Sequence, residues 1–206
     1  MISTTTDRKL WLSSKVAKAF SFDEYLYQIE QILSQPYPES VQKQNSYHTY
    51  IAMNYQRMNR WLKVLKPTSF TFSFSVQKSL VLLTLTESWC GDAAHILPIL
   101  YFICKQNGLE LKLLYRDEHP DLMDAYLTNG SRSIPKVIIL DTELNELGSW
   151  GPRPADAQKL YNRLKSSTSD LNTIIHKLQL WYNRDKGVHT FLEVQEVLKS
   201  HSSTYF

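Results

Sequence analysis

A short apolar segment, Val81 to Thr86, constrains the fold more than any other part of the chain. The run Val-Leu-Leu-Thr-Leu-Thr lacks the polar alternation of a solvent-facing strand, which is typical of a strand buried on both faces. Strands of this kind occur in parallel or mixed sheets that helices cover on both sides. The segment therefore favours an α/β fold with such a sheet at its centre.

Strand and helix patterns alternate around this segment. Further strands are predicted at 70–76, 109–115, 136–140 and 146–150, with the last two forming a hairpin. Helices are predicted at 22–34, where Ser21 and Glu24 form a capping box, and at 47–65, 92–107 and 120–127. More helices are predicted after the Gly-Pro-Arg-Pro at 151–154. One of them is capped by Asp170 and ended by Gly187. The last begins with a capping-box pattern at Thr190 and Glu193.

Composition excludes several classes of protein. The 206 residues are 43% hydrophobic and carry a net charge of only +3, which excludes a disordered chain and gives no reason to expect nucleic acid as a partner. The apolar run Ile96 to Cys104 is about half of the roughly 20 residues that a membrane span needs. The polar amino terminus does not resemble a secretory signal, so we expect a protein of the reducing cytoplasm.

A basic stripe follows one face of the helix predicted at 47–65. It consists of Arg57, Arg60, Lys63 and Lys66 and has no acidic partner on that face. Such a stripe binds phosphate in some proteins, but no aromatic platform or nucleic-acid motif accompanies it here. A solvated helix face is the simpler interpretation.

The candidate reactive group is Cys90, at the junction of the buried strand and the next helix. Unpaired N–H groups and a partial positive charge at a helix amino terminus both favour a thiolate over a thiol. The position therefore predicts an activated sulfur. The alternative is that Cys90 is a small buried hydrophobic residue.

Five short motifs follow one another in the second half of the chain: Glu87-Ser-Trp-Cys-Gly-Asp-Ala-Ala, Arg116-Asp-Glu, Leu127-Thr-Asn-Gly, Ser133-Ile-Pro-Lys and Trp150-Gly-Pro-Arg-Pro. In this order they resemble the thioredoxin superfamily and, more closely, a bacterial branch of "thioredoxin family proteins". The match runs over about residues 70 to 166. The resemblance implies a thioredoxin-like three-layer core at 67–166, with a helical amino-terminal extension at 1–66 and carboxyl-terminal helices at 167–206 packed on the core.

The resemblance also assigns roles to individual residues. Cys90 matches the nucleophile of the family, preceded by Trp89 and followed by Gly91, and Pro135 matches the cis-proline that faces the sulfur. Ile134 would then offer its backbone N–H and C=O to an extended substrate. An ordinary trans-proline at the start of a strand is the alternative for Pro135.

The departures from the family pattern concern the redox chemistry. Ala93 occupies the position of the resolving cysteine, Asp92 that of a usual proline, and Thr84 that of a buried acid. Cys104 cannot replace the missing thiol, because 14 residues of helix separate the two cysteines by about 21 Å, and a disulfide spans about 7 Å at most between Cα atoms. We therefore expect Cys104 to be a core residue.

The polar residues near Cys90 each allow two interpretations. Asp92 either bonds free N–H groups of the first helical turn or relays protons for Cys90, although its charge would raise the pKa of the thiol. Glu87 is a possible substitute acid. Arg132 and Arg153 either receive a substrate carboxylate or form surface ion pairs.

A metal site is the weaker interpretation of the same region. Glu87, Cys90, Asp92 and His95 mix soft and hard ligands, but Cys90 and His95 are five residues apart, a spacing that does not align them on one helix face. We expect no metal, with His95 solvated or packed against a helix.

Two functions follow as hypotheses. The first is monothiol disulfide exchange through Cys90 on a protein or low-molecular-weight disulfide, with Asp92 and Glu87 as possible catalytic groups. No bound cofactor is expected, and an external thiol would complete the cycle because no internal cysteine can. The second is a noncatalytic binding or scaffold module that has kept the fold and lost the chemistry.

Overall fold

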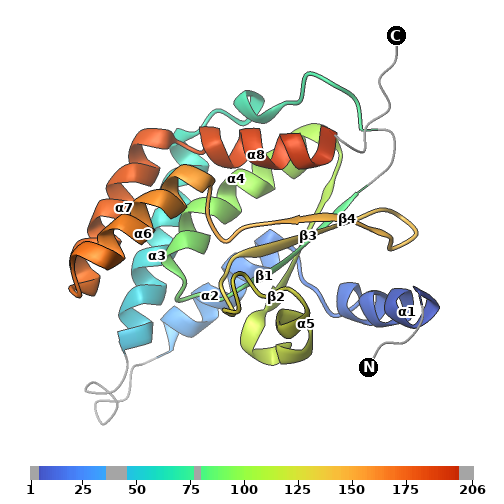
Figure 1. The fold of residues 1–206 in the computed structure, drawn as a ribbon, viewed down its shortest axis with the longest axis horizontal. Coiled ribbons are helices and arrows are strands. Elements are labelled where there is room, and N and C mark those ends of the chain that lie inside the picture. Colours follow the sequence, from blue (N-terminus) through green and yellow to red (C-terminus); the bar gives the residue numbers. More distant parts are fainter. Residues whose placement is uncertain (1–4, 36–45, 77–79, 200–206) are drawn as a thin grey trace.

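The computed structural model describes residues 5–35, 46–76 and 80–199, and its centre is a four-stranded mixed sheet of order β2-β1-β3-β4 (Figure 1). The central strand β1 (Val81–Thr86) pairs in parallel with β2 (Glu110–Tyr115) and antiparallel with β3 (Lys136–Leu140). β3 forms the predicted hairpin with β4 (Glu146–Trp150). Leu82 to Thr86 are all buried, as the apolar run predicts.

Helices cover both sides of the sheet and extend the molecule at both ends (Figure 1). The long helix α4 packs against the sheet, with α3 and α8 packed onto α4, whereas α1 and α5 lie on the opposite side of the sheet. The helices are α1 (Thr5–Val16), α2 (Phe22–Ser34), α3 (Ser46–Val64), α4 (Gly91–Asn107), α5 (Pro120–Ala125), α6 (Ala155–Ser167), α7 (Leu171–Asp185) and α8 (Val188–Lys199). Single 3-10 turns lie at Pro67–Phe70 and Arg116–Glu118.

The core includes residues from the sheet and from both helical extensions. Leu12 of α1, Tyr25 of α2, Met58 of α3 and Val194 of α8 are each buried in the same apolar cluster as the strands. The capping box predicted for α2 is present, with Ser21 and Glu24 bonded reciprocally. No helix among the described residues is long and apolar enough to cross a membrane.

The strand predicted at 70–76 is wrong. Phe70 ends a 3-10 turn, and the extended residues that follow pair with no strand in the described part of the chain. The Asn107 side chain occupies the backbone groups that a neighbouring strand would bond, accepting from Phe72 N–H at 2.7 Å and donating to Phe70 C=O at 2.7 Å. Phe70 and Phe72 are still buried and stack on Phe102 and Phe191, respectively, whereas Phe74 is half-buried.

Two helices, α1 and α8, also differ from the sequence interpretation. The polar segment that forms α1 gives no clear apolar period and was not predicted as a helix. Thr190 does not cap α8, because the helix already begins at Val188 and Thr190 is buried within it. Glu193 instead accepts from Trp150 Nε1 at 2.9 Å and from Ala155 N–H at 2.7 Å, which ties α8 to the end of β4 and the start of α6.

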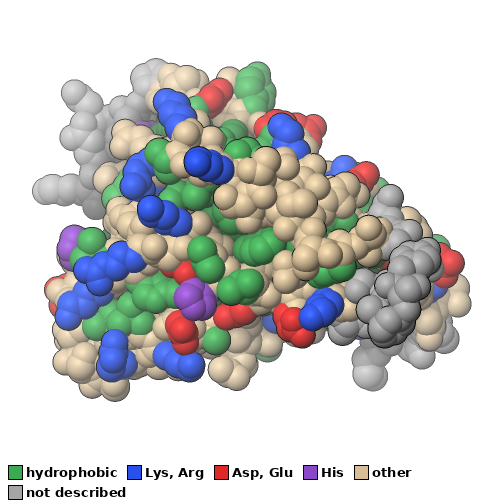
Figure 2. Space-filling model, turned by 90° about the horizontal axis from the view of Figure 1, so that it is seen from above, with side chains coloured by type: hydrophobic (Ala, Val, Ile, Leu, Met, Phe, Trp, Pro, Cys, Tyr) green, Lys and Arg blue, Asp and Glu red, His purple; other side chains and the backbone are tan. Residues whose placement is uncertain are grey.

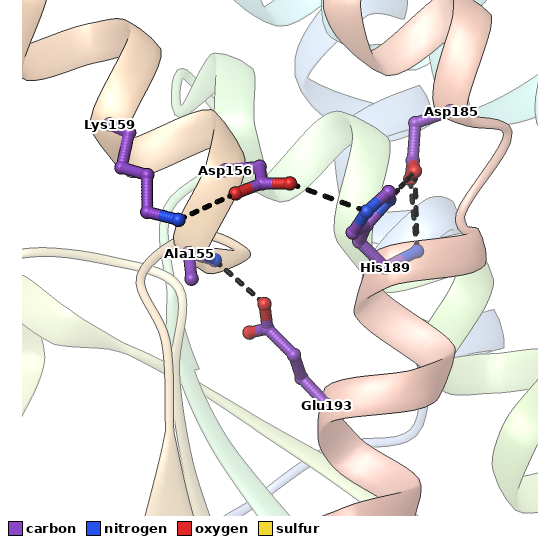
Figure 3. A network of polar contacts seen from close by, with 6 residues as sticks. All are labelled: Ala155, Asp156, Lys159, Asp185, His189 and Glu193. Atoms are coloured by element: carbon purple, nitrogen blue, oxygen red, sulfur yellow. Dashed lines mark hydrogen bonds and ion pairs between the residues drawn. The ribbon is translucent and has the colours of Figure 1, made fainter.

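His189 of α8 lies against carboxylates of α6 and α7 (Figure 3). Its Nδ1 contacts Asp185 at the end of α7, and its Nε2 lies 3.5 Å from Asp156 of α6. The hydrogen bond to Asp185 raises the pKa of His189 above its ordinary value of 6.5, with smaller contributions from the charges of Asp185, Asp156 and Glu193.

We expect His189→Gln to remove a pH-dependent part of the stability. A raised folded pKa means that the stabilisation is complete below about pH 6.5 and is lost as the pH rises through the folded pKa above it. Melting temperatures measured between pH 5.5 and 8.5 should therefore fall less steeply in the variant than in the parent. His176→Gln, at an exposed position of α7, is the control and should keep the parent slope. Parallel curves for parent and His189→Gln would contradict the prediction.

Candidate functional site

Cys90 is the N-cap residue of α4, at the junction that the sequence predicts. Its Sγ accepts from Ala93 N–H at 3.5 Å, and the thiol donates to Ile134 C=O at 3.5 Å. The Ile134–Pro135 peptide is cis, as the resemblance implies. The sulfur therefore faces the backbone before the cis-proline, as expected for a thioredoxin-like site.

The thiol of Cys90 is not activated in this arrangement. Burial raises its pKa to about 12, and the negative charge of Asp92 acts in the same direction, while Ala93 N–H and Arg153 oppose them. Only 8% of the residue is exposed. The stabilisation of a thiolate by the helix amino terminus is therefore present, but burial and Asp92 outweigh it.

Asp92 holds together three segments that are distant in the sequence. Its carboxylate lies 2.6 Å from an Nη of Arg153 in the loop after β4 and accepts from the Tyr182 hydroxyl of α7 at 2.8 Å. The side chains of Asp92 and Arg153 are only 12% and 15% exposed. These contacts favour the structural interpretation of Asp92. Arg153 forms an ion pair, but a largely buried one rather than the surface pair that the sequence suggests.

Glu87 lies at the end of β1 and is also buried. It accepts from Asp117 N–H at 2.9 Å, and burial raises its pKa above the ordinary value. The carboxylate thus joins the end of β1 to the turn after β2. The backbone C=O of Glu87 accepts from Cys90 N–H at 3.0 Å, but no described hydrogen bond or ion pair joins the Glu87 carboxylate to Cys90.

Two further arginines near the site have acidic partners. Arg132 binds Asp124 through two contacts of 2.7 Å and is exposed. Arg116 pairs with Asp117, and its guanidinium lies 5.0 Å from the centre of the Trp89 ring. The structure therefore favours the simpler interpretation of Arg132, a surface ion pair.

Cys90 opens into a pocket of about 370 Å³, which is within the size range of small-molecule sites. The helices α3 and α7 and the residue Tyr161 of α6 form its walls above the amino terminus of α4. The lining combines apolar side chains of α7 with four arginines and a single carboxylate. Its charged residues are Arg57, Arg116, Arg132, Arg153 and Asp92, and Trp89, Gly91 and Ile134 also line it.

Arg57 is the site residue that sequence reasoning missed. The prediction of a solvated basic face holds for Arg60, Lys63 and Lys66, which are exposed, but is wrong for Arg57, which is buried. Its amine groups donate to Asn54 Oδ1 at 2.9 Å and to Gln179 Oε1 at 2.6 Å. The contact with Gln179 explains the difference, because α7 buries Arg57, whereas Arg60 stays exposed although it donates to Asn183 Oδ1 of α7 at 2.9 Å.

His95 and Cys104 are both core residues. His95 accepts from Trp61 Nε1 at 3.0 Å and stacks on Tyr182, and burial lowers its pKa to about 3, with help from the nearby charges of Arg57 and Arg60. Cys104 is 3% exposed, and both cysteines are free. Among the described residues, no group of three or more His, Cys, Asp or Glu side chains could hold a metal.

A second, more open pocket of about 560 Å³ lies between α6 and α7. Figure 2 views the molecule from this side and shows basic side chains interspersed with apolar ones. The cations of this pocket, Lys159, Arg163, Lys177 and Arg184, are all exposed. Solvated cations need no counter-ion, so this surface points to no particular ligand.

Comparisons with known proteins agree with this geometry. A family model described as thioredoxin matches residues 40–166. Thioredoxin of Bacillus subtilis (strain 168) is 31% identical over 106 residues, which are 50% of this chain and 98% of the relative.

Two solved structures share the fold over almost the whole chain. An HIV epitope scaffold has a TM-score of 0.57 at 19% identity, covering 91% of this chain and 97% of the scaffold. A protein of unknown function from Pseudomonas aeruginosa has a TM-score of 0.56 at 16% identity, covering 92% and 98%. Because the family model spans more than half of the sequence, over the sheet and the Cys90 junction, the chain belongs to the thioredoxin family.

Proposed function

We propose that this thioredoxin-type protein is a monothiol carrier, which binds a small disulfide in the pocket above Cys90 and retains one half of it as a mixed disulfide. The observation that carries the proposal is the position of the sulfur, which lies in a small-molecule pocket and contacts Ile134 C=O beside the cis-proline. The WCGD motif of the bacterial branch, with Ala93 after it, supports a single-thiol reaction.

The proposed reaction balances without a bound cofactor. Cys90 loses its proton to solvent, and the thiolate attacks one sulfur of a disulfide RSSR. A Cys90–S–S–R bond forms while the S–S bond of RSSR breaks, and the departing RS⁻ takes up a proton to become RSH. An external thiol later attacks the mixed disulfide and returns Cys90 to the reduced form.

The raised pKa of Cys90 supports a carrier rather than a fast catalyst. A thiol of high pKa is a poor leaving group, so an attacking external thiol expels Cys90 slowly. The same property makes the initial attack slow at neutral pH, because few molecules carry the thiolate. Slow expulsion makes the mixed disulfide long-lived, and both effects oppose rapid turnover.

Intact mass spectrometry after incubation with hydroxyethyl disulfide tests the proposal. We expect one adduct per folded chain at pH 9, the same adduct on Cys104→Ala, and none on Cys90→Ala. Incubation in urea should yield adducts at both cysteines, which controls for reagent quality. A folded chain that stays unmodified at pH 9 while the urea sample reacts would contradict the carrier function.

A noncatalytic binding module is the second candidate. The small exposed fraction of Cys90 and its raised pKa favour it, because both oppose reaction of the sulfur. It predicts that ligands occupy the pocket equally well in the parent and in Cys90→Ala. An unreactive Cys90 in the mass experiment would leave this function as the better proposal.

A further inference from the structure

Arg57 brings a positive charge into the interior without a matching negative charge. It is 9% exposed, and no carboxylate of the described residues lies within ion-pair distance. Its described partners, Asn54 and Gln179, are neutral amides, and its Nε is buried with no hydrogen-bond partner. Because a buried charge is costly unless it is paired, this position favours a negative charge supplied from elsewhere.

The other pocket arginines do not share this property. Arg153 is paired with Asp92, Arg132 with Asp124 and Arg116 with Asp117. Asp92 is the sole acidic residue of the described pocket lining, and Arg153 already occupies it. Arg57 is therefore the arginine of the described pocket lining whose positive charge has no acidic partner.

Arg57 is held in place next to the reactive junction. Asn54, which is fully buried, accepts from Arg57 and donates to Ser88 C=O at 3.0 Å, two residues before Cys90. A Cβ placed on Gly91 would lie 3.7 Å from Arg57 Nη1, so the guanidinium stands against the first turn of α4. The guanidinium and the positive end of α4 thus act on the same part of the pocket.

We propose that the Cys90 pocket selects small molecules that carry a carboxylate, with Arg57 as the residue that recognises it. The inference deepens the proposed function, since it names the class of disulfide that the carrier would take. Binding of the anion does not itself require Cys90 to react. The selectivity can therefore be measured on a chain that has no reactive sulfur in the pocket.

Three symmetric disulfides of similar size provide the probes. 3,3′-Dithiodipropionate has two carboxylates, hydroxyethyl disulfide is neutral, and cystamine has two amines. On Cys90→Ala, calorimetric titration should give the tightest binding for the dianion, by about tenfold over the neutral probe, and the weakest for the dication. The preference should decrease as salt is raised.

The matched variants are Arg57→Gln and Arg60→Gln, both in the Cys90→Ala background. Arg60 lies one turn further along α3, is exposed and does not line the pocket. We expect Arg57→Gln to lose the preference for the dianion, Arg57→Lys to retain part of it, and Arg60→Gln to retain all of it. Melting temperatures without ligand show whether each variant folds.

The outcomes separate this inference from the carrier function. Equal binding of the three probes, or a dianion preference that survives Arg57→Gln, overturns the anion selectivity even if Cys90 forms adducts. A dianion preference that depends on Arg57, together with an unreactive Cys90, overturns the carrier and leaves the selectivity. If Arg57→Gln does not fold, the anion selectivity is decided by the order of affinities of the three probes for Cys90→Ala and by whether high salt removes that order.

Discussion

Cys90 of the folded chain should react with hydroxyethyl disulfide at least about 30-fold more slowly at pH 8 than the same cysteine of the chain unfolded in urea. A pKa of about 12 in place of 9.0 lowers the thiolate fraction about a thousandfold, and the greater nucleophilicity of the more basic thiolate restores only part of the rate. The measurement is adduct formation against time on Cys104→Ala, which leaves Cys90 as the single thiol.

The pH dependence of this rate gives the sharper test. A thiol with a pKa near 12 should react about ten times faster for each pH unit from 7 to 10 and reach no plateau. The urea-unfolded chain should level off above about pH 9. A plateau of the folded chain below pH 9 would show a thiolate more stable than this geometry allows.

Asp92→Asn should accelerate the same reaction by about tenfold at pH 8. The substitution removes the carboxylate that raises the pKa of Cys90 and leaves the charge of Arg153 unpaired beside the sulfur. Asp124→Asn is the control, because Asp124 pairs with an exposed arginine and does not line the pocket. Equal rates for the two variants would mean that burial alone sets the reactivity.

Gly151→Ala should reduce the free energy of unfolding by about 3 kcal/mol. A Cβ at this position would lie 2.4 Å from Pro135 O, and the residue has a φ of +109°, which side-chain-bearing residues rarely adopt. Pro135 O is a backbone atom and not the end of a flexible side chain, so the backbone beside the cis-proline would have to move. Urea unfolding monitored by circular dichroism measures the loss.

Gly130→Ala provides the matched control for this substitution. Gly130 also has a positive φ, +73°, but no atom lies within 4 Å of an added Cβ. We expect a loss of about 1 kcal/mol, which is the conformational cost alone. Equal losses at both positions would show that contact with Pro135 contributes nothing.

The reactive junction was predictable because local sequence determines it. The apolar run of β1, the N-cap position of Cys90 and the proline at 135 each act within a few residues of chain or match a short family motif. The reactivity of Cys90 was not predictable in the same way. It depends on burial, and burial depends on helices that are distant in the sequence.

Arg57 and the segment after Pro67 show the same limitation. The basic stripe looks uniformly solvated until α7 buries Arg57, and no periodicity in α3 records that contact. The alternating phenylalanines at 70 and 72 are buried as predicted, but Asn107 rather than a strand satisfies their backbone. In both cases the local pattern allows two structures, and a side chain from another element, Gln179 of α7 or Asn107 of α4, selects one of them.

The walls of the Cys90 pocket belong largely to helices outside the sheet: α3, which lies within the region that the family model matches, and α7, which follows it. The sulfur and the cis-proline, in contrast, are fixed by β1, α4 and β3. Substitutions in α3 or α7 can therefore alter which molecules reach the sulfur without disturbing the strands that hold it.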